Sequence, residues 1–468
     1  MARKILDSWK EIARYLQRNA RTCQRWEKEM GLPVHRFEDA SRSRVFAYQD
    51  ELDKWLKEKS QRPDLSGAKK KVSTQIFKWS LGTLIILLVL IITWRAIIFF
   101  SPREPHDFQL EHNKLIILDQ KHRPIWEYEF PNISLSSNET YHSRFQKKAL
   151  LPNPAGIPAW FLPLIYIGNI NQDQHKEVLF MVNWDKAQPN SYFYCFDYRG
   201  RLLWQFLPQE APKFGEITYS KFFRNHGFYL EDFNQDGRQE IIAIFNCNLF
   251  FPTLLVLLDC EGKSLGHYWN SGRLNEVITY DLEGDGQKEI ILGAQNNEWR
   301  QCAVIVLSPD HVEGASPQTK DYYSCKNTSV RGREKYYLLL PLNEVAAKIT
   351  TLNTIFKIQL LDGPRFQVNE KTAHLIYTFD RNMNLVFFDY SHLFIQTFNE
   401  LKRKGVYPPE MTAKQVANQI KEKGVRYFDG EKWVKTPTMT RFWKEKQKAR
   451  LAGFEPATFG SGVRRSIP

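Results

Sequence analysis

The sequence is poor in cysteine and lacks the short motifs of common catalytic sites. It has six cysteines in 468 residues and no C-x-x-C pair, which excludes a disulfide-dense scaffold and a zinc or redox site of that type. It also lacks G-x-S-x-G, H-E-x-x-H and a glycine-rich phosphate loop, so no familiar spacing places a nucleophile beside a base. We therefore expect a binding protein and not an enzyme.

The composition also excludes a disordered chain and indicates several domains. Hydrophobic residues make up 43% of the chain and aromatic residues 14%, which is typical of folded proteins. Residues 1–78 have a net charge of +8, residues 79–400 of −5 and residues 401–468 of +10, so separate parts face different surroundings. We predict a head at 1–59, a flexible basic linker at 60–75, a transmembrane helix at 76–100, a β-domain at 106–397, a basic extension at 398–450 and a disordered or artefactual tail at 451–468.

Only one apolar run has the length of a membrane span. Trp79 to Phe100 is 22 residues, about 33 Å as a helix, against roughly 30 Å for the hydrocarbon core. The alternatives are a buried soluble helix or a signal sequence, and a signal sequence would begin the chain. Lysines cluster before the run, which keeps the N-terminus inside. The pattern predicts a single-pass protein of the inner (cytoplasmic) membrane, with a cytoplasmic N-terminus and a periplasmic or extracellular C-terminal domain.

The head has the pattern of short capped helices with a basic surface. Ser8-Trp9-Lys10-Glu11 has the form of a capping box, and a second helix from about Ala20 to Met30 ends at Gly31-Leu32-Pro33. A basic hairpin and a third helix follow, which predicts a small α-helical winged helix-turn-helix. Arginine, glutamine and lysine side chains on such a fold contact base edges and phosphates of DNA. The candidate DNA-binding residues are Arg18, Arg21, Thr22, Gln24, Arg25, Lys28, Arg36, Arg42 and Arg44.

The stretch LDSWKEIARYLQRNARTCQRWEKEMGLPVHR, followed by VFAYQDELDKWL, resembles the MerR and excisionase type of DNA-binding head. The resemblance covers residues 5–57 and implies DNA binding by Arg21, Thr22, Gln24 and Arg25 with help from the wing. No long coiled coil follows, so any homodimer must pair elsewhere. The alternative is a module that keeps this fold but binds protein, with its basic residues solvated.

The region after the apolar run contains a repeat. N-I-N-Q-D-Q-H-K-E begins at Asn169, D-F-N-Q-D-G-R-Q-E at Asp232 and D-L-E-G-D-G-Q-K-E at Asp281, and apolar segments flank each. A second landmark, a turn around Asp197, Asp259 or Ser308, follows each loop start after 27 or 28 residues. Strand-turn-strand units of this length predict an all-β domain, a β-propeller of about seven blades.

The three repeated loops carry the oxygen ligands of a calcium site. Oxygen side chains at positions 1, 3, 5 and 9 converge on a tight turn, and glycine at position 6 permits the left-handed bend. The alternative for each loop is a polar β-turn. The first loop has Gln174 in place of the glycine, so we expect its calcium site to be weak or empty. The candidate ligands are Asp232, Asn234, Asp236 and Glu240, then Asp281, Glu283, Asp285 and Glu289, and more weakly Asn169, Asn171, Asp173 and Glu177.

These loops resemble the FG-GAP, or VCBS, repeats of integrin-α-like propellers. The resemblance implies structural Ca²⁺ and a propeller that binds proteins, glycans or surfaces. We therefore expect a membrane-tethered regulator, in which the head binds DNA and the exported propeller senses a ligand or a periplasmic or extracellular partner. The alternative is a calcium-dependent adhesion protein whose head is a protein-interaction module. In the extension, residues 391–405 and 411–424 are predicted helices and residues 426–434 a hairpin with an Asp-Gly turn.

Overall fold

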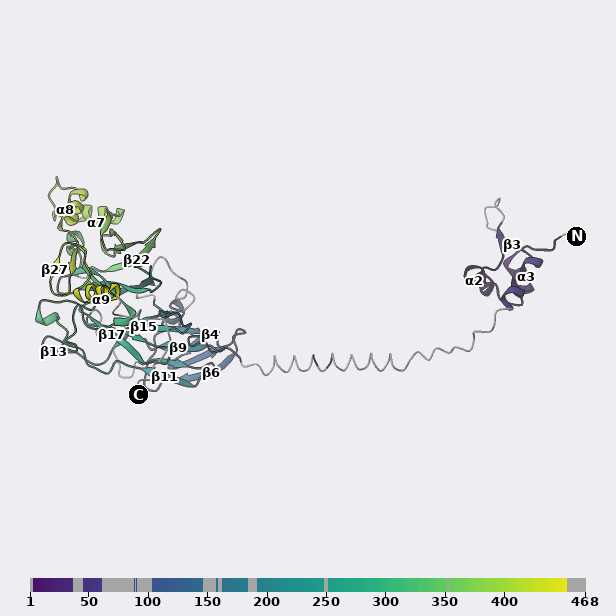
Figure 1. Ribbon diagram of the computed structural model, residues 1–468, viewed down its shortest axis with the longest axis horizontal. Coiled ribbons are helices and arrows are strands. Elements are labelled where there is room, and N and C mark those ends of the chain that lie inside the picture. The colour runs from purple at the N-terminus through teal and green to yellow at the C-terminus, as the bar shows by residue number, and fades with distance from the viewer. Residues whose placement is uncertain are drawn as a thin grey trace. The chain divides into compact units, whose positions relative to one another are not determined.

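The computed structural model describes residues 3–36, 45–60, 88, 90, 103–145, 157–158, 162–183, 192–247, 251–351 and 353–452. The chain divides into two compact units, residues 1–101 and residues 102–468, which we call the head and the body (Figure 1). Each is described by itself.

The head mixes helices with a small sheet. Its elements are β1 (Ile5–Leu6), α1 (Trp9–Tyr15), α2 (Ala20–Met30), β2 (His35–Arg36), β3 (Val45–Tyr48) and α3 (Gln49–Ser60). Local chemistry sets the helix ends: the Asn19 side chain accepts from the Thr22 N–H at the start of α2, and left-handed Gly31 ends it. The strands form a sheet in the order β1-β3-β2. The predicted small α-helical head with a basic hairpin is therefore corrected to a mixed one, because Ile5 and Leu6 add a strand that pairs with β3.

The helices of the head pack on a small apolar core. Ile12, Cys23 and Leu52 are fully buried. The Trp26 and Trp55 rings lie 5.7 Å apart, and Trp55 Nε1 donates to the Met30 carbonyl at 3.1 Å. These contacts tie α3 to the end of α2 and leave the opposite side of α2 exposed.

The described part of the body contains five antiparallel sheets of three or more strands, which follow one another along the chain. The first sheet has β4 (Asp107–Glu111), β5 (Lys114–Leu118) and β6 (Pro124–Glu129). The second has β8 (Ile165–Gly168), β9 (Glu177–Met181), β10 (Phe193–Phe196) and β11 (Leu202–Phe206). The third has β14 (Arg224–Glu231), β15 (Glu240–Asn246), β16 (Thr253–Leu258) and β17 (Ser264–Asn270).

The fourth sheet has β18 (Leu274–Tyr280), β19 (Glu289–Asn296), β20 (Gln301–Leu307) and β21 (Tyr336–Leu339), extended by β26 (Arg426–Phe428) and β27 (Trp433–Val434) beyond β21 and by β7 (Ile157–Pro158) beside β18. The fifth has β22 (Ile355–Leu361), β23 (Arg365–Glu370), β24 (Leu375–Asp380) and β25 (Leu385–Tyr390). Strands β12 (Lys213–Phe214) and β13 (Ile217–Thr218) form a separate pair.

Successive up-and-down sheets of this kind make the body propeller-like. The prediction of an all-β domain with about seven blades is corrected on two points. The described residues form five such sheets. The predicted β-domain at 106–397 also contains the short helices α5 (Asn138–Ser143) and α6 (Glu344–Ala347). The chain continues with α7 (His392–Arg403), α8 (Ala413–Lys423) and α9 (Arg441–Leu451). The predicted helices at 391–405 and 411–424 and the hairpin at 426–434 are confirmed by α7, α8 and the β26–β27 pair.

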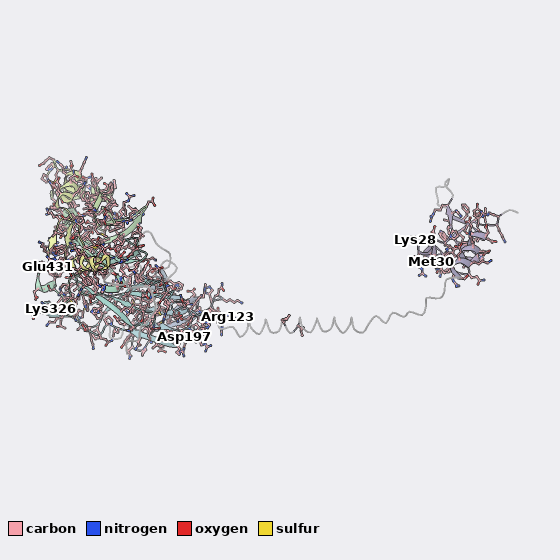
Figure 2. The ribbon with its side chains drawn as sticks, viewed as in Figure 1. Lys28, Met30, Arg123, Asp197, Lys326 and Glu431 are labelled. Carbon is pink, nitrogen blue, oxygen red and sulfur yellow. The ribbon has the colours of Figure 1, made fainter. Side chains whose placement is uncertain are left out.

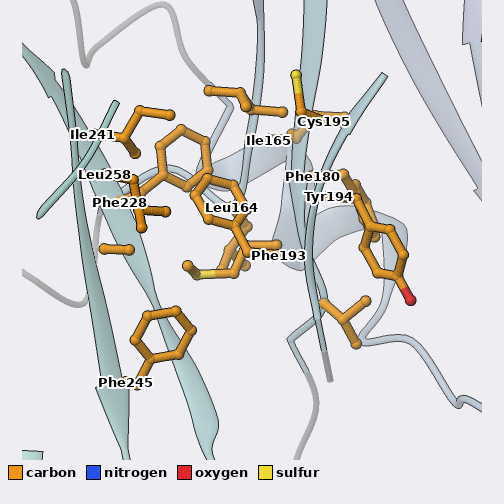
Figure 3. Packing of buried hydrophobic residues seen from close by; sticks show 14 of the residues in the cluster. Leu164, Ile165, Phe180, Phe193, Tyr194, Cys195, Phe228, Ile241, Phe245 and Leu258 are labelled. Carbon is orange, nitrogen blue, oxygen red and sulfur yellow. The ribbon is translucent and has the colours of Figure 1, made fainter. Parts of the chain in front are cut away.

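Three apolar clusters join the sheets in chain order. One connects the first, second and third sheets, the next the third and fourth, and the last the fourth and fifth with α7 and α8. Figure 3 shows part of the first cluster, where Phe193 of β10 packs near Phe228 of β14, with ring centroids 4.8 Å apart. In Figure 1 the first sheet lies at one end of the body, and α7 and α8 lie at the other.

A repeated tryptophan contact also joins neighbouring sheets. Trp126 Nε1 donates to the Tyr198 carbonyl at 3.2 Å, and Trp204 Nε1 donates to the Cys260 carbonyl at 2.9 Å. Each indole packs against a glycine, Gly200 or Gly262, where an added Cβ would lie 2.6 or 2.5 Å from the ring. All six cysteines are free and buried.

No helix in the ranges that the structure describes is long and apolar enough to cross a membrane. This finding contradicts the predicted transmembrane helix and, with it, the predicted single-pass location in the inner membrane. Of the predicted segment 76–100, the described residues include Leu88 and Leu90 alone. The predicted linker at 60–75 and tail at 451–468 also fall almost wholly outside the described residues.

Candidate functional site

The three acidic loops occupy equivalent places in three neighbouring sheets. They connect β8 to β9, β14 to β15 and β18 to β19, and we call them the first, second and third loops. The glutamate at position 9 opens the following strand, and its carboxylate accepts the backbone N–H of position 2. These bonds are Glu177 from Ile170 at 3.0 Å, Glu240 from Phe233 at 2.9 Å and Glu289 from Leu282 at 2.9 Å.

Glutamines at position 4 link each loop to the next. Gln172 Nε2 donates to the Asp236 carbonyl at 2.7 Å, and Gln235 Nε2 donates to the Gly286 carbonyl at 2.8 Å. Both glutamines have positive φ, 65° and 57°, which directs their side chains along the row. The three loops therefore lie side by side and form one continuous edge of the body.

A nitrogen donor stands between the acidic groups of each loop. In the first loop Asn171 Nδ2 lies 3.1 Å from Asp173 Oδ2 and 3.3 Å from Glu177 Oε1. In the second, Asn234 Nδ2 lies 3.1 Å from Asp236 Oδ2 and 3.4 Å from Glu240 Oε1. These amides hold positions 5 and 9 together in the way that a bound cation would.

The third loop has Glu283 at that position, and a lysine from a distant segment provides the donor. Lys335 Nζ lies 3.1 Å from Glu283 Oε1 and 2.5 Å from Glu289 Oε1. Lys335 is 6% exposed. Burial disfavours its charge, but Glu289 and Glu283 outweigh burial and raise the pKa of the ammonium. A second cation, Arg450 Nη1 of α9, lies 2.9 Å from Asp285 Oδ2.

The second loop fits a cation best on its chemistry. Asp232 Oδ1 is buried and has no hydrogen-bond partner among the described residues. Burial, together with the nearby Asp236 and Asp232 charges, raises the pKa of Glu240 to about 7. A bound cation would lower this pKa and would give Asp232 Oδ1 a partner. As the side chains stand, no three His, Cys, Asp or Glu residues in the described ranges converge as a metal site. A bound ion would therefore have to draw these carboxylates inward.

The third loop does not fit a metal in this arrangement, because Lys335 and Arg450 already pair with three of its four carboxylates. Sequence reasoning missed both residues. Lys335 follows Glu283 by more than fifty positions, and Arg450 lies in the basic extension. Nothing local to either residue signals the contact. A cavity of about 300 Å³ separates the third loop from α9, and Trp443 and Lys446 contribute to its lining.

The candidate DNA-binding residues of the head gather on the outer side of α2. Arg18, Arg21, Gln24, Arg25 and Lys28 are exposed, and Figure 2 labels Lys28 at the end of this helix. Thr22 is half-buried and its hydroxyl bonds to Asn19 Oδ1 at 2.9 Å, so it also serves the helix cap. Arg36 lies 3.0 Å from Glu27. Arg42 and Arg44 lie outside the described residues.

Comparison with known proteins identifies no family. No family model matches the chain, and no curated protein matches it. Among solved structures, one described as the structure of the Dos1 propeller matches at a TM-score of 0.28 and 10% identity, over 60% of this chain and 66% of that one. A Glu150Gln mutant of Synechocystis apocarotenoid oxygenase matches at a TM-score of 0.23 and 10% identity, over 58% of this chain and 66% of that one.

The chain thus covers slightly less than two thirds of each matched structure. At such low scores these likenesses carry no argument about activity, and the propeller-like description of the body rests on its sheet topology. One of these two matched structures is an oxygenase. The prediction that the chain is not an enzyme, which rested on missing motifs alone, is withdrawn.

Proposed function

We propose that the protein is a regulator with two binding parts, in which the head binds duplex DNA and the propeller-like body binds a partner. The observation that carries the proposal is the exposed basic side of α2, which lies opposite a well-packed core. The body supplies a rigid scaffold of joined sheets, and its partner is a protein or a glycan.

The dimensions and chemistry of α2 suit the major groove. Its 11 residues make a helix about 16 Å long, and a groove about 12 Å wide admits one helix. Arg21, Gln24 and Arg25 stand near the start of α2, which is where recognition helices contact base edges. Arginine and glutamine pair bidentately with guanine and adenine, respectively. Arg36 of β2 lies beside α2 through its ion pair with Glu27 and suits a phosphate contact.

We also propose that the second loop binds Ca²⁺ as a structural ion. Asp232, Asp236 and Glu240 would supply oxygens, and the buried unpartnered Asp232 Oδ1 supports this assignment. None of the ion pairs in the described part of the chain uses these three carboxylates. The bound ion would tie the start of the loop to β15, in the place now bridged by the Asn234 amide.

The DNA proposal is tested on the full chain. Duplexes are selected from a random library, and affinity for an enriched sequence is measured across a salt series. We expect Arg21→Ala and Arg25→Ala each to weaken binding about tenfold or more, since a bidentate base contact contributes roughly 1–3 kcal/mol. Lys57→Ala, on the exposed side of α3, is the matched control and should keep base preference. A folded wild-type chain that binds no DNA at low salt would refute the proposal and leave the head as a protein-interaction module.

A further inference from the structure

The third loop differs from the other two in charge. It has carboxylates at positions 1, 3, 5 and 9, namely Asp281, Glu283, Asp285 and Glu289. The second loop has Asn234 at position 3 and therefore one carboxylate fewer. The extra negative charge makes the third loop look like the stronger metal site from sequence. Its surroundings in the folded chain show the opposite.

Two cations of the chain itself reach into the third loop. Lys335 Nζ bridges Glu283 and Glu289, at positions 3 and 9. Arg450 pairs with Asp285 at position 5. The carboxylate at position 1, Asp281, is already used by the backbone, since it accepts from the N–H groups of Gly284 at 2.7 Å and Gly286 at 2.9 Å. Three of the four carboxylates are therefore paired with cations of the chain itself.

The position of Lys335 is set by its backbone as well as by its charge. Its N–H donates to the Val306 carbonyl at 2.8 Å, and its carbonyl accepts from the Thr440 N–H at 3.2 Å. The Trp443 ring of α9 lies 5.3 Å from Nζ, within the range of a cation–π contact. The ammonium is thus enclosed by carboxylates on one side and by an indole on the other.

We propose that the third loop is closed by Lys335 and Arg450 and binds no metal, so that the second loop is the calcium site of this row. A Ca²⁺ ion needs six or more oxygens at roughly 2.3–2.6 Å. In the third loop it would meet an ammonium already bound to two of these carboxylates, and like charges at this distance repel strongly in a buried site. Expelling Lys335 would also leave a buried charge without its partners, which is costly. The inference about the third loop does not depend on the proposed calcium site. Only the role given to the second loop rests on it.

The test is the Ca²⁺ stoichiometry of the full chain, measured by isothermal titration calorimetry after removal of bound ions with a chelator. We expect one site per chain. Asp281→Asn should leave it unchanged, whereas Asp232→Asn at the equivalent position of the second loop should weaken it at least tenfold. Lys335→Met should gain one site, because it keeps the stem of the side chain and removes the charge. Lys335→Arg keeps the charge and should gain none.

The outcomes separate the two proposals. A wild-type stoichiometry that falls in Asp281→Asn overturns the inference, and so does a folded Lys335→Met variant that gains no site. If the wild-type chain binds no Ca²⁺, the proposed calcium site in the second loop fails, while a site gained in Lys335→Met still supports the inference. Circular dichroism identifies a variant that does not fold. If Lys335→Met does not fold, the inference is decided by comparing the Ca²⁺ stoichiometry of the wild type with that of Asp281→Asn, which leaves Lys335 in place.

Discussion

Glu276 makes the stability of the body depend on pH in a direction opposite to that of a surface carboxylate. It lies in β18, is fully buried, and accepts one hydrogen bond from the Ile358 N–H of β22 at 3.2 Å. Its other oxygen, Oε2, has no partner among the described residues. Burial raises the pKa of Glu276 to about 9, and the Ile358 N–H and Lys357 offset only part of this rise. Folding therefore favours the protonated form.

The size of the effect follows from the two pKa values. The unfolded chain ionises with the ordinary glutamate pKa of 4.5, and the folded chain with a pKa of about 9. Because the folded value is raised, the stabilising contribution is complete below pH 4.5 and is lost progressively as the pH rises toward 9. Each pH unit in this window lowers the free energy of unfolding by about 1.4 kcal/mol. Between pH 4.5 and pH 7 the loss is about 3 kcal/mol.

Glu276→Gln removes the titration and keeps the shape of the side chain. We expect the free energy of unfolding of the variant, minus that of the wild type, to rise by about 3 kcal/mol between pH 4.5 and pH 7. Urea unfolding followed by tryptophan fluorescence measures it. Glu334 and Glu370, whose pKa values burial raises to about 7, titrate in both proteins and cancel in the difference. Glu422→Gln on the exposed side of α8 is the control. A difference that stays flat with pH would refute the reasoning.

Three further substitutions test the packing of the two units, one in the head and two in the body. Trp55→Ala removes the ring that packs against Trp26 and the hydrogen bond to Met30. We expect the head to lose about 3–5 kcal/mol of unfolding free energy, measured as a lower thermal midpoint by circular dichroism. A midpoint within a degree of wild type would contradict this expectation. Gly272→Ala places a Cβ 2.0 Å from the Gln295 carbonyl oxygen at a φ of +152°, so we expect the body not to reach its native fold. Gly363→Ala, where φ is +74° but the space is open, should cost only about 1 kcal/mol, and equal effects of the two changes on urea unfolding would count against this account.

The acidic loops show which structural features a local sequence pattern predicts. Their spacing predicted three equivalent turns, two of them with glycine at position 6, and Gly237 and Gly286 indeed have positive φ, 83° and 87°. The second landmark is confirmed as a turn at Asp197 and Asp259, whereas Ser308 precedes a short 3-10 helix, Pro309–His311. The carboxylates of Asp197 and Asp259 each accept two backbone N–H groups within the next four residues. Such features depend on residues a few positions apart, so the sequence contains them in full.

The same loops show why a metal site is harder to predict. The first, second and third loops look alike in sequence, yet only the third meets Lys335 and Arg450. That difference depends on which distant segment packs against each loop. The pattern of oxygens describes a possible ligand set, and only the fold shows which of those oxygens are already in use.

The sequence alone determined the local elements of this protein: the capped helices of the head, the repeated strand-turn-strand units and the helices α7 and α8. Capping, turn chemistry and apolar periodicity act over a few residues, which explains their success. The tertiary structure decided the number of sheets, the mixed architecture of both units, the burial of Glu276 and the partners of the third loop. These properties depend on contacts between segments far apart in the chain, because burial and ion pairing are set by what packs against a residue and not by its neighbours in sequence.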